Sequence, residues 1–205
     1  MTRVLIADDH PMIAAALEML LRGSDYELVG RARSGAEALN QVQRLKPDLL
    51  LLDVNMPDGS GLDVLKQLRQ SRRAPATVLL TAGMDDVQLL TASVLEPEGM
   101  VLKTSDPALL LECMEQVRSG QHCIDPEIAE RIDKAKEKAA RAPSLTPRER
   151  ELIDLVRQGL RNRDIAAQLG VTEGTVKVYL HAIFDKVGVD NRTELAMRAG
   201  ELLGR

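Results

Sequence analysis

The first half of the chain is organised around the stretch Leu49-Leu50-Leu51-Leu52-Asp53-Val54-Asn55-Met56-Pro57-Asp58-Gly59. Four leucines that end abruptly in an aspartate, followed by a turn with proline and glycine, are typical of a strand buried in a parallel sheet. Open α/β sheets hold their ligand sites at the carboxyl ends of such strands. The stretch therefore predicts an α/β fold in which Asp53 lies at the functional edge of the sheet.

Three other short apolar runs also end in polar residues. They are 4–7 before Asp8 and Asp9, 77–80 before Thr81, and 99–102 before Lys103. Carboxylate oxygens suit Mg²⁺, while a hydroxyl and an ammonium can stabilise the charge on a transferring phosphoryl group. Because parallel strands end at the same edge, these residues predict a magnesium-dependent phosphoryl site. The plainer alternative is that each polar residue only terminates its strand, and four such residues in this order disfavour it.

Residues 1–120 alternate between short aliphatic runs and helical patterns. Strands are expected near 3–7, 27–32, 48–53, 77–81 and 99–102, and helices near 11–22, 35–45, 61–71, 85–95 and 106–119. Such alternation is typical of βαβ units that build a parallel sheet. We therefore expect one α/β domain over residues 1–120.

The rest of the chain changes character twice. Residues 121–143 contain a helix that Asp125-Pro126 opens, and this helix is highly charged with few large apolar side chains. We expect it to be a solvated helical linker that ends before residues 142–144. Residues 144–205 then show four helical segments, the first of which begins with a capping box at 146–149. This last part predicts a separate all-α domain of four helices.

The composition excludes several classes of protein. The 205 residues include only three aromatic side chains, Tyr26, Tyr179 and Phe184, so a base-stacking surface for single-stranded nucleic acid is not expected. The two cysteines, Cys113 and Cys123, lack CxxC spacing, and we expect reduced thiols. No apolar run approaches the ~20 residues of a membrane span, and the N-terminus has no secretory pattern. We therefore expect a cytoplasmic protein that has no membrane partner.

The last domain has the spacing of a helix-turn-helix. Residues 165–172 followed by Val176 combine a small residue, a turn glycine and apolar residues that close the corner between two helices. On the second of these helices, Lys177, Val178 and His181 fall opposite the apolar face. An exposed Val178 beside a lysine suits contact with a thymine methyl group in the major groove. A plain solvent face is the alternative, and the small charge of +1 over residues 144–205 does not decide between them.

The first domain resembles the receiver domain of two-component response regulators. The matching residues are Asp8-Asp9, Asp53 with Met56-Pro57-Asp58-Gly59, Thr81-Ala82, and Lys103. The resemblance implies a doubly wound (βα)5 fold with sheet order 2-1-3-4-5. It also implies that a sensor histidine kinase, or a small phosphodonor, phosphorylates Asp53. By the same resemblance, Mg²⁺ is held by Asp8, Asp9, Asp53 and the main-chain carbonyl of Asn55, and Thr81 and Lys103 contact the phosphoryl group.

Two features depart from the receiver pattern. Family members usually carry tyrosine or phenylalanine three residues before the lysine, as a switch coupled to the threonine, and Met100 stands there instead. The segment Leu95-Glu96-Pro97-Glu98 replaces the expected turn of small residues. These departures predict an unconventional activation, unless Met100 is only a core residue and Thr81 alone carries the switch. His10 and His122 have no metal-ligand spacing, and we expect both to be structural or solvent-facing.

The second domain resembles the LuxR-type DNA-binding domain over residues 145–203. The matching segments are 145–151, Gly159-Leu160, 173–177, Ile183-Phe184 and 191–194. The resemblance implies that 173–187 is the recognition helix and that Lys177, Val178 and His181 face DNA. Candidate phosphate contacts are Arg161, Asn162, Arg163 and Lys186. The last helix, 192–203, would be the dimerisation helix.

Together the two resemblances identify the chain as a NarL/FixJ-type response regulator. We expect phosphorylation of Asp53 to control homodimerisation and binding to double-stranded promoter DNA, with no enzymatic activity beyond the receiver's own phosphorylation and autodephosphorylation. Three alternatives stay open: an atypical receiver whose DNA binding ignores phosphorylation, a phosphate sink without a DNA role, and a phosphatase with an aspartyl nucleophile. Asn55 in place of a second aspartate, and the lack of a substrate cap, argue against the phosphatase.

Overall fold

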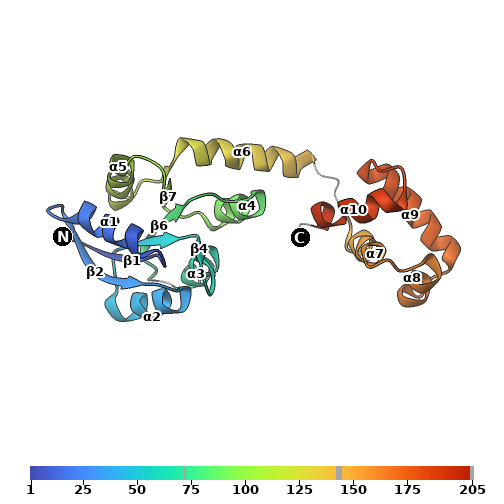
Figure 1. Ribbon diagram of the computed structural model, residues 1–205, viewed down its shortest axis with the longest axis horizontal. Coiled ribbons are helices and arrows are strands. Elements are labelled where there is room, and N and C mark those ends of the chain that lie inside the picture. Colours follow the sequence, from blue (N-terminus) through green and yellow to red (C-terminus); the bar gives the residue numbers. More distant parts are fainter. Residues whose placement is uncertain (72, 142–144, 204–205) are drawn as a thin grey trace. The chain divides into compact units, whose positions relative to one another are not determined.

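The computed structural model describes residues 1–71, 73–141 and 145–203 (Figure 1). The chain forms two compact units, Met1–Glu137 and Lys138–Arg205, and each is described by itself. Among the described residues, none of the helices combines the length and the apolar character that crossing a membrane requires.

The first unit is built on a parallel sheet in the order β2-β1-β3-β6-β7-β8. The strands are β1 (Thr2–Ala7), β2 (Tyr26–Ala32), β3 (Leu49–Asp53), β6 (Ala76–Thr81), β7 (Gly99–Leu102) and β8 (Cys123–Ile124). The first five have the expected order 2-1-3-4-5. A sixth strand, β8, extends the sheet at residues expected to belong to the linker. The predicted turn after Asp53 contains a small hairpin, β4 (Asn55–Met56) and β5 (Gly59–Ser60).

Helices cover both faces of this sheet. On one face are α1 (Pro11–Leu21) and α5 (Pro107–Arg118), and on the other are α2 (Gly35–Leu45), α3 (Gly61–Leu68), α4 (Asp86–Leu95) and α6 (Pro126–Arg141). The leucine run of β3 feeds both cores, because successive side chains of a strand point to opposite faces. Leu50 and Leu52 pack in the core beneath α2, α3, α4 and α6, whereas Leu49 and Leu51 pack beneath α1 and α5. This two-sided burial explains why the strand has no polar alternation.

Helix α6 differs from the solvated linker expected from its composition. Ile128, Ile132 and Ala135 are buried, and they belong to the same core cluster as Met84 and Met100. Figure 1 shows α6 running beside α4. The three apolar residues recur at i, i+4 and i+7, so a helix that is mostly charged still presents one apolar stripe to the core of the first unit. The expected end of the linker at residues 142–144 lies outside the described residues.

Helix α6 is held by polar contacts in addition to its apolar stripe. Asp125 accepts hydrogen bonds from the Ser105 hydroxyl at 2.7 Å and from the main-chain N–H of Glu127 at 2.9 Å. The Arg131 guanidinium donates to the main-chain carbonyl of Met84. The helix is therefore tied to the loop after β7 and to the loop after β6.

The second unit contains four helices, which confirms the predicted all-α domain. They are α7 (Pro147–Arg157), α8 (Asn162–Leu169), α9 (Glu173–Val187) and α10 (Arg192–Leu203). Thr146 and Glu149 form the predicted capping box at the start of α7. Gly170 has φ 67° between α8 and α9, a left-handed conformation that glycine adopts without steric cost. This turn sets the angle between the two helices of the predicted helix-turn-helix.

Candidate functional site

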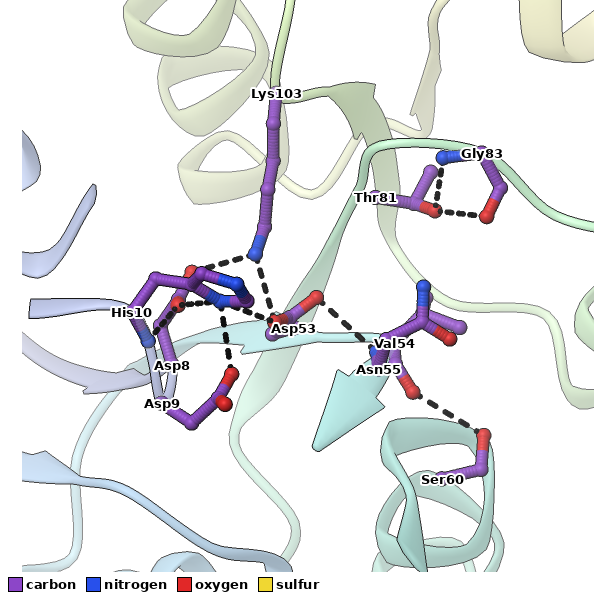
Figure 2. A network of polar contacts seen from close by, with 10 residues as sticks. All are labelled: Asp8, Asp9, His10, Asp53, Val54, Asn55, Ser60, Thr81, Gly83 and Lys103. Atoms are coloured by element: carbon purple, nitrogen blue, oxygen red, sulfur yellow. Dashed lines mark hydrogen bonds and ion pairs between the residues drawn. The ribbon is translucent and has the colours of Figure 1, made fainter. Parts of the chain in front are cut away.

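Strands that lie close together in the sheet bring the predicted acidic residues and the lysine to one edge. Asp8 and Asp9 follow β1, Asp53 ends β3, and Lys103 follows β7. The ammonium nitrogen of Lys103 lies 2.8 Å from Asp8 Oδ2 and 2.7 Å from Asp53 Oδ2 (Figure 2). The sequence therefore predicted correctly that these side chains converge.

Burial governs the electrostatics of this cluster. Asp8 is 2% and Asp53 1% exposed. Burial raises the pKa of Asp53 above its usual value, although Lys103 and the N–H of Asn55 act in the opposite direction. Burial alone would lower the pKa of Lys103, but Asp53 and Asp8 outweigh it and hold that pKa above its usual value. One ammonium thus faces several carboxylates and leaves the site with an excess of negative charge.

Three carboxylate oxygens of the cluster accept no hydrogen bond from any described residue. They are Asp8 Oδ2, Asp9 Oδ1 and Asp53 Oδ2. Two of these atoms, Asp8 Oδ2 and Asp53 Oδ2, face the Lys103 ammonium, and the third lies 2.9 Å from His10 Nδ1. One ammonium cannot balance three carboxylates, and uncompensated charge is costly in a buried site unless a further cation binds. The donor set, which is mainly carboxylate oxygen, fits a hard divalent ion such as Mg²⁺.

The backbone beside Asp53 is held closely by the start of α3. The N–H of Asn55 donates to Asp53 Oδ1 at 3.1 Å, and the N–H of Gly61 donates to the carbonyl of Val54 at 2.8 Å. A Cβ atom at Gly61 would lie 2.1 Å from the carbonyl oxygen of Asp53. Only glycine allows this approach, so Gly61 positions Asp53. Sequence reasoning did not single out Gly61, because the contact depends on how α3 meets β3.

Neither of the two predicted switch residues, Thr81 and Met100, forms a hydrogen bond with the carboxylates in the described part of the chain. The Thr81 hydroxyl donates to the carbonyl of Gly83 at 2.9 Å and accepts from the Gly83 N–H at 3.0 Å (Figure 2). It is therefore engaged with its own loop rather than with Asp53. Met100 is 1% exposed and lies in the core beneath α4 and α6. This placement matches the plainer of the two expectations for Met100, that of a core residue.

His10 lies at the acidic cluster and not away from it. Its Nδ1 is 2.9 Å from Asp9 Oδ1 and 3.4 Å from Asp8 Oδ1. His10 was expected to be structural or solvent-facing, and its side chain is largely exposed, but its ring nitrogen also joins the carboxylates in one group of potential metal ligands. Its place directly after Asp8-Asp9 was the signal available in the sequence. His122 instead lies 3.3 Å from the carbonyl of Pro97.

The second unit presents one face of α9 to solvent. Val176 and Leu180 are buried against the other helices, whereas Lys177, Val178 and His181 are exposed, with 66% of Val178 accessible. A shallow hollow on this face is lined by Asn162, Lys177, Val178, Leu180, His181, Phe184 and Arg192. An aliphatic side chain exposed between two basic or polar ones is the arrangement expected of a helix that reads a DNA groove.

The candidate phosphate contacts fall into two groups. Arg161 and Arg163 are exposed around the start of α8. The Asn162 side chain accepts a hydrogen bond from Arg192 at 2.9 Å. The ammonium of Lys186 lies 2.8 Å and 3.0 Å from the carboxylate oxygens of Glu149. Arg161 and Arg163 are therefore the freer cations, while Asn162 and Lys186 are engaged within the unit.

Comparisons with known proteins agree with this division of the chain. Residues 4–115 match the family described as response regulator receiver domain, and residues 143–199 match the bacterial regulatory proteins of the luxR family.

Similar proteins match along almost the whole chain. The nitrate/nitrite response regulator protein NarL of Escherichia coli (strain K12) is 33% identical, over 95% of this chain and 93% of NarL. The DNA-binding transcriptional activator DevR/DosR of Mycobacterium tuberculosis is 34% identical, over 98% and 95%.

Solved structures show the same fold. The RcsB response regulator of Salmonella typhimurium has a TM-score of 0.73 at 23% identity and covers 96% of this chain and 98% of its own, a likeness of fold alone. The response regulator ChrA has a TM-score of 0.59 at 29% identity, over 98% and 96%. The chain therefore belongs to the NarL/FixJ-type two-component response regulators, in which a receiver domain is joined to a LuxR-type helix-turn-helix domain.

Proposed function

We propose that a sensor histidine kinase phosphorylates Asp53 in the presence of Mg²⁺, and that this modification controls dimerisation and promoter binding. The observation that carries the proposal is the carboxylate of Asp53. It is buried, and its Oδ2 lies 2.7 Å from the ammonium of Lys103 in a site that holds more carboxylates than cations. The protein would act in the cytoplasm, where it meets promoter DNA. Its only chemistry would be its own phosphorylation and the hydrolysis of the product.

The residues around Asp53 have distinct roles in this proposal. Asp8, Asp9, Asp53 and the carbonyl of Asn55 would hold the magnesium ion. When bound, the ion would offset the repulsion among the carboxylates and the charge that develops on the phosphoryl oxygens. Lys103, already 2.7 Å from Asp53 Oδ2, would then pair with a phosphoryl oxygen. These groups can act without large movements, as electrostatic preorganisation requires.

The Thr81 loop supplies a route from the site to helix α6. If the Thr81 hydroxyl turns toward a phosphoryl oxygen, it leaves both of its contacts with Gly83. The next residue, Met84, is buried and accepts the hydrogen bond from Arg131 of α6. A shift of this loop would therefore change how α6 is held. A coupling of ~1–3 kcal/mol between the two arrangements is enough to change DNA occupancy severalfold or more.

The second unit would bind double-stranded DNA through α9. Lys177, Val178 and His181 would face base edges in the major groove, and Arg161 and Arg163 would contact phosphates. Asn162 and Lys186 remain further candidates, although each would first have to leave its present partner. Helix α10 would provide the dimer contact, so the operator would contain two half-sites related by two-fold symmetry.

One observation favours a second candidate function, an atypical receiver whose DNA binding ignores phosphorylation. Met100 occupies the position of the usual aromatic switch and is fully buried beneath α6. A buried methionine has no hydroxyl or planar ring to swing outward, so Thr81 alone would have to report the state of Asp53.

Intact mass spectrometry after incubation with acetyl phosphate and Mg²⁺ tests the phosphorylation. Asp53→Asn removes the proposed acceptor, and Asp63→Asn, at an exposed position of α3, is the matched control. The wild type and the control should each gain one phosphoryl group, and the Asp53 variant none. A gain in the Asp53 variant would refute the assignment. Promoter affinity of phosphorylated and unphosphorylated protein would then separate the two candidate functions.

A further inference from the structure

His10 is fixed beside the carboxylate cluster, yet the proposed phosphoryl chemistry does not use it. Its main-chain N–H donates to Asp8 Oδ1 at 2.8 Å, which ties the residue to the site. His10 occupies the N-cap position of α1, but its side chain makes no capping hydrogen bond there. Helix capping therefore does not explain where the imidazole lies.

The imidazole approaches all three carboxylates through the same nitrogen (Figure 2). Nδ1 lies 2.9 Å from Asp9 Oδ1, 3.4 Å from Asp8 Oδ1 and 3.9 Å from Asp53 Oδ2. Asp9 Oδ1 accepts no hydrogen bond from any described residue despite the short distance. Two acceptor atoms at this separation can share a cation.

The three distances from His10 Nδ1 fall in the range between ligands of one ion. With bonds of ~2.1 Å in octahedral geometry, adjacent ligand atoms lie ~3 Å apart and opposite ones ~4.2 Å apart. The ligand atoms of Asp8, Asp9, His10 and Asp53 all lie within 4.8 Å of one another. The Oδ2 atoms of Asp8 and Asp53, each on a side chain at least nine-tenths buried, face the Lys103 ammonium at 2.8 Å and 2.7 Å, so this part of the site is built to hold positive charge.

We propose that His10 Nδ1 is a direct ligand of the divalent ion in this site, which raises the affinity for transition ions relative to Mg²⁺. The inference rests on the metal site of the proposed function and adds its ligand set. Imidazole nitrogen favours Mn²⁺, Co²⁺, Ni²⁺ and Zn²⁺, whereas Mg²⁺ prefers oxygen and keeps its waters. The neutral tautomer would carry its proton on Nε2, and the side chain is 62% exposed. Ion selectivity, rather than phosphoryl transfer itself, is the property that His10 would set.

Electron paramagnetic resonance of bound Mn²⁺ tests the ligand directly. The full chain without a histidine tag is stripped of metal and loaded with Mn²⁺, and electron spin echo modulation reports any coordinated ¹⁴N. The wild type should show nitrogen modulation, and His10→Ala should lack it. His122→Ala is the matched control, because it removes an exposed histidine of the same unit, beside the carbonyl of Pro97, and should keep the signal.

Calorimetric titration gives the selectivity. His10→Ala should weaken Ni²⁺ binding at least ~10-fold. Removal of a residue that only hydrogen-bonds to a metal ligand already lowers metal affinity ~10-fold or more, and His10 would be a ligand itself. Mg²⁺ binding should change less than ~3-fold, because an oxygen of water can replace the nitrogen. His10→Asp offers a second test: an oxygen ligand at this position should keep or raise Mg²⁺ affinity and leave Ni²⁺ affinity below that of the wild type.

The possible failures are distinguishable. Bound Mn²⁺ without nitrogen modulation, or an equal loss of Ni²⁺ and Mg²⁺ affinity in His10→Ala, would overturn the role of His10 and leave the carboxylate site intact. A wild-type protein that binds no divalent ion would overturn both the ligand and the metal requirement of the proposed function.

Discussion

Replacement of Ile132 by alanine measures how firmly α6 is packed on the receiver. Ile132 is 5% exposed and lies one turn from Ile128 in the core cluster. The change removes three carbon atoms, worth ~0.8 kcal/mol each when buried, or ~2.4 kcal/mol in total. The cavity left behind adds to this loss, and partial collapse of a peripheral helix reduces it. We therefore expect the free energy of unfolding of the first unit to fall by ~2–3 kcal/mol.

The assay must follow the two units separately. Hydrogen exchange read by mass spectrometry at increasing urea gives the opening free energy of β3 for the first unit and of α9 for the second. Exchange should accelerate in β3 and stay unchanged in α9. Lys136→Ala, an exposed position on the same helix, is the control and should change stability by less than ~0.5 kcal/mol. If Ile132→Ala costs no more than this control, α6 behaves as a solvated linker and the packing argument is wrong.

Three further predictions address the site and the DNA-binding face. Gly61→Ala places a Cβ 2.1 Å from the Asp53 carbonyl oxygen, so the backbone must shift. The free energy of unfolding, measured by urea titration, should fall by ~1–3 kcal/mol, and phosphorylation should be lost. Gly83→Ala is the control, because its Cβ meets no atom within 4 Å, and it should cause neither effect. Equal effects of the two variants would contradict the steric argument. Asp53→Asn should raise the melting temperature of the metal-free protein at neutral pH, because burial raises the pKa of Asp53 and its charge costs stability there. Because the pKa of Asp53 is raised, the wild type gains stability as the pH falls through that pKa and the carboxylate is protonated. The difference in melting temperature between the variant and the wild type, measured by calorimetry, should therefore shrink toward acid pH. A difference that grows toward acid pH would contradict this explanation. Arg163→Ala should lower DNA affinity for all sequences and reduce the slope of log K against log salt by ~1, while Val178→Ala should change sequence preference by ~1–3 kcal/mol without altering the slope. Fluorescence anisotropy with promoter and scrambled DNA at several salt concentrations separates the two, and identical behaviour would remove the distinction between phosphate and base contacts.

The elements that the sequence predicted best are those with long or repeated local patterns. The leucine run before Asp53 could only be a strand buried on both faces, and the turn glycines Gly170 and Gly188 marked the ends of α8 and α9. The convergence of Asp8, Asp53 and Lys103 followed from the rule that parallel strands end at one edge.

Features that depend on distant neighbours were missed. Strand β8 has two residues and exists because it pairs with β7, so no local pattern could reveal it. The stripe of α6 was present in the spacing of Ile128, Ile132 and Ala135, but its high charge suggested solvation. The pairing of Lys186 with Glu149 joins residues 37 apart, and only the packing of α7 against α9 brings them together.

The attachment of α6 decides where this chain can be cut. A fragment that ends at residue 120 loses β8 and uncovers the side of the core that Ile128 and Ile132 protect. Such a fragment would expose an apolar surface and an open strand edge, both of which favour aggregation. A fragment that ends at residue 137 keeps the strand and the stripe. A foreign output domain should therefore be joined to the receiver after residue 137, where the first compact unit ends.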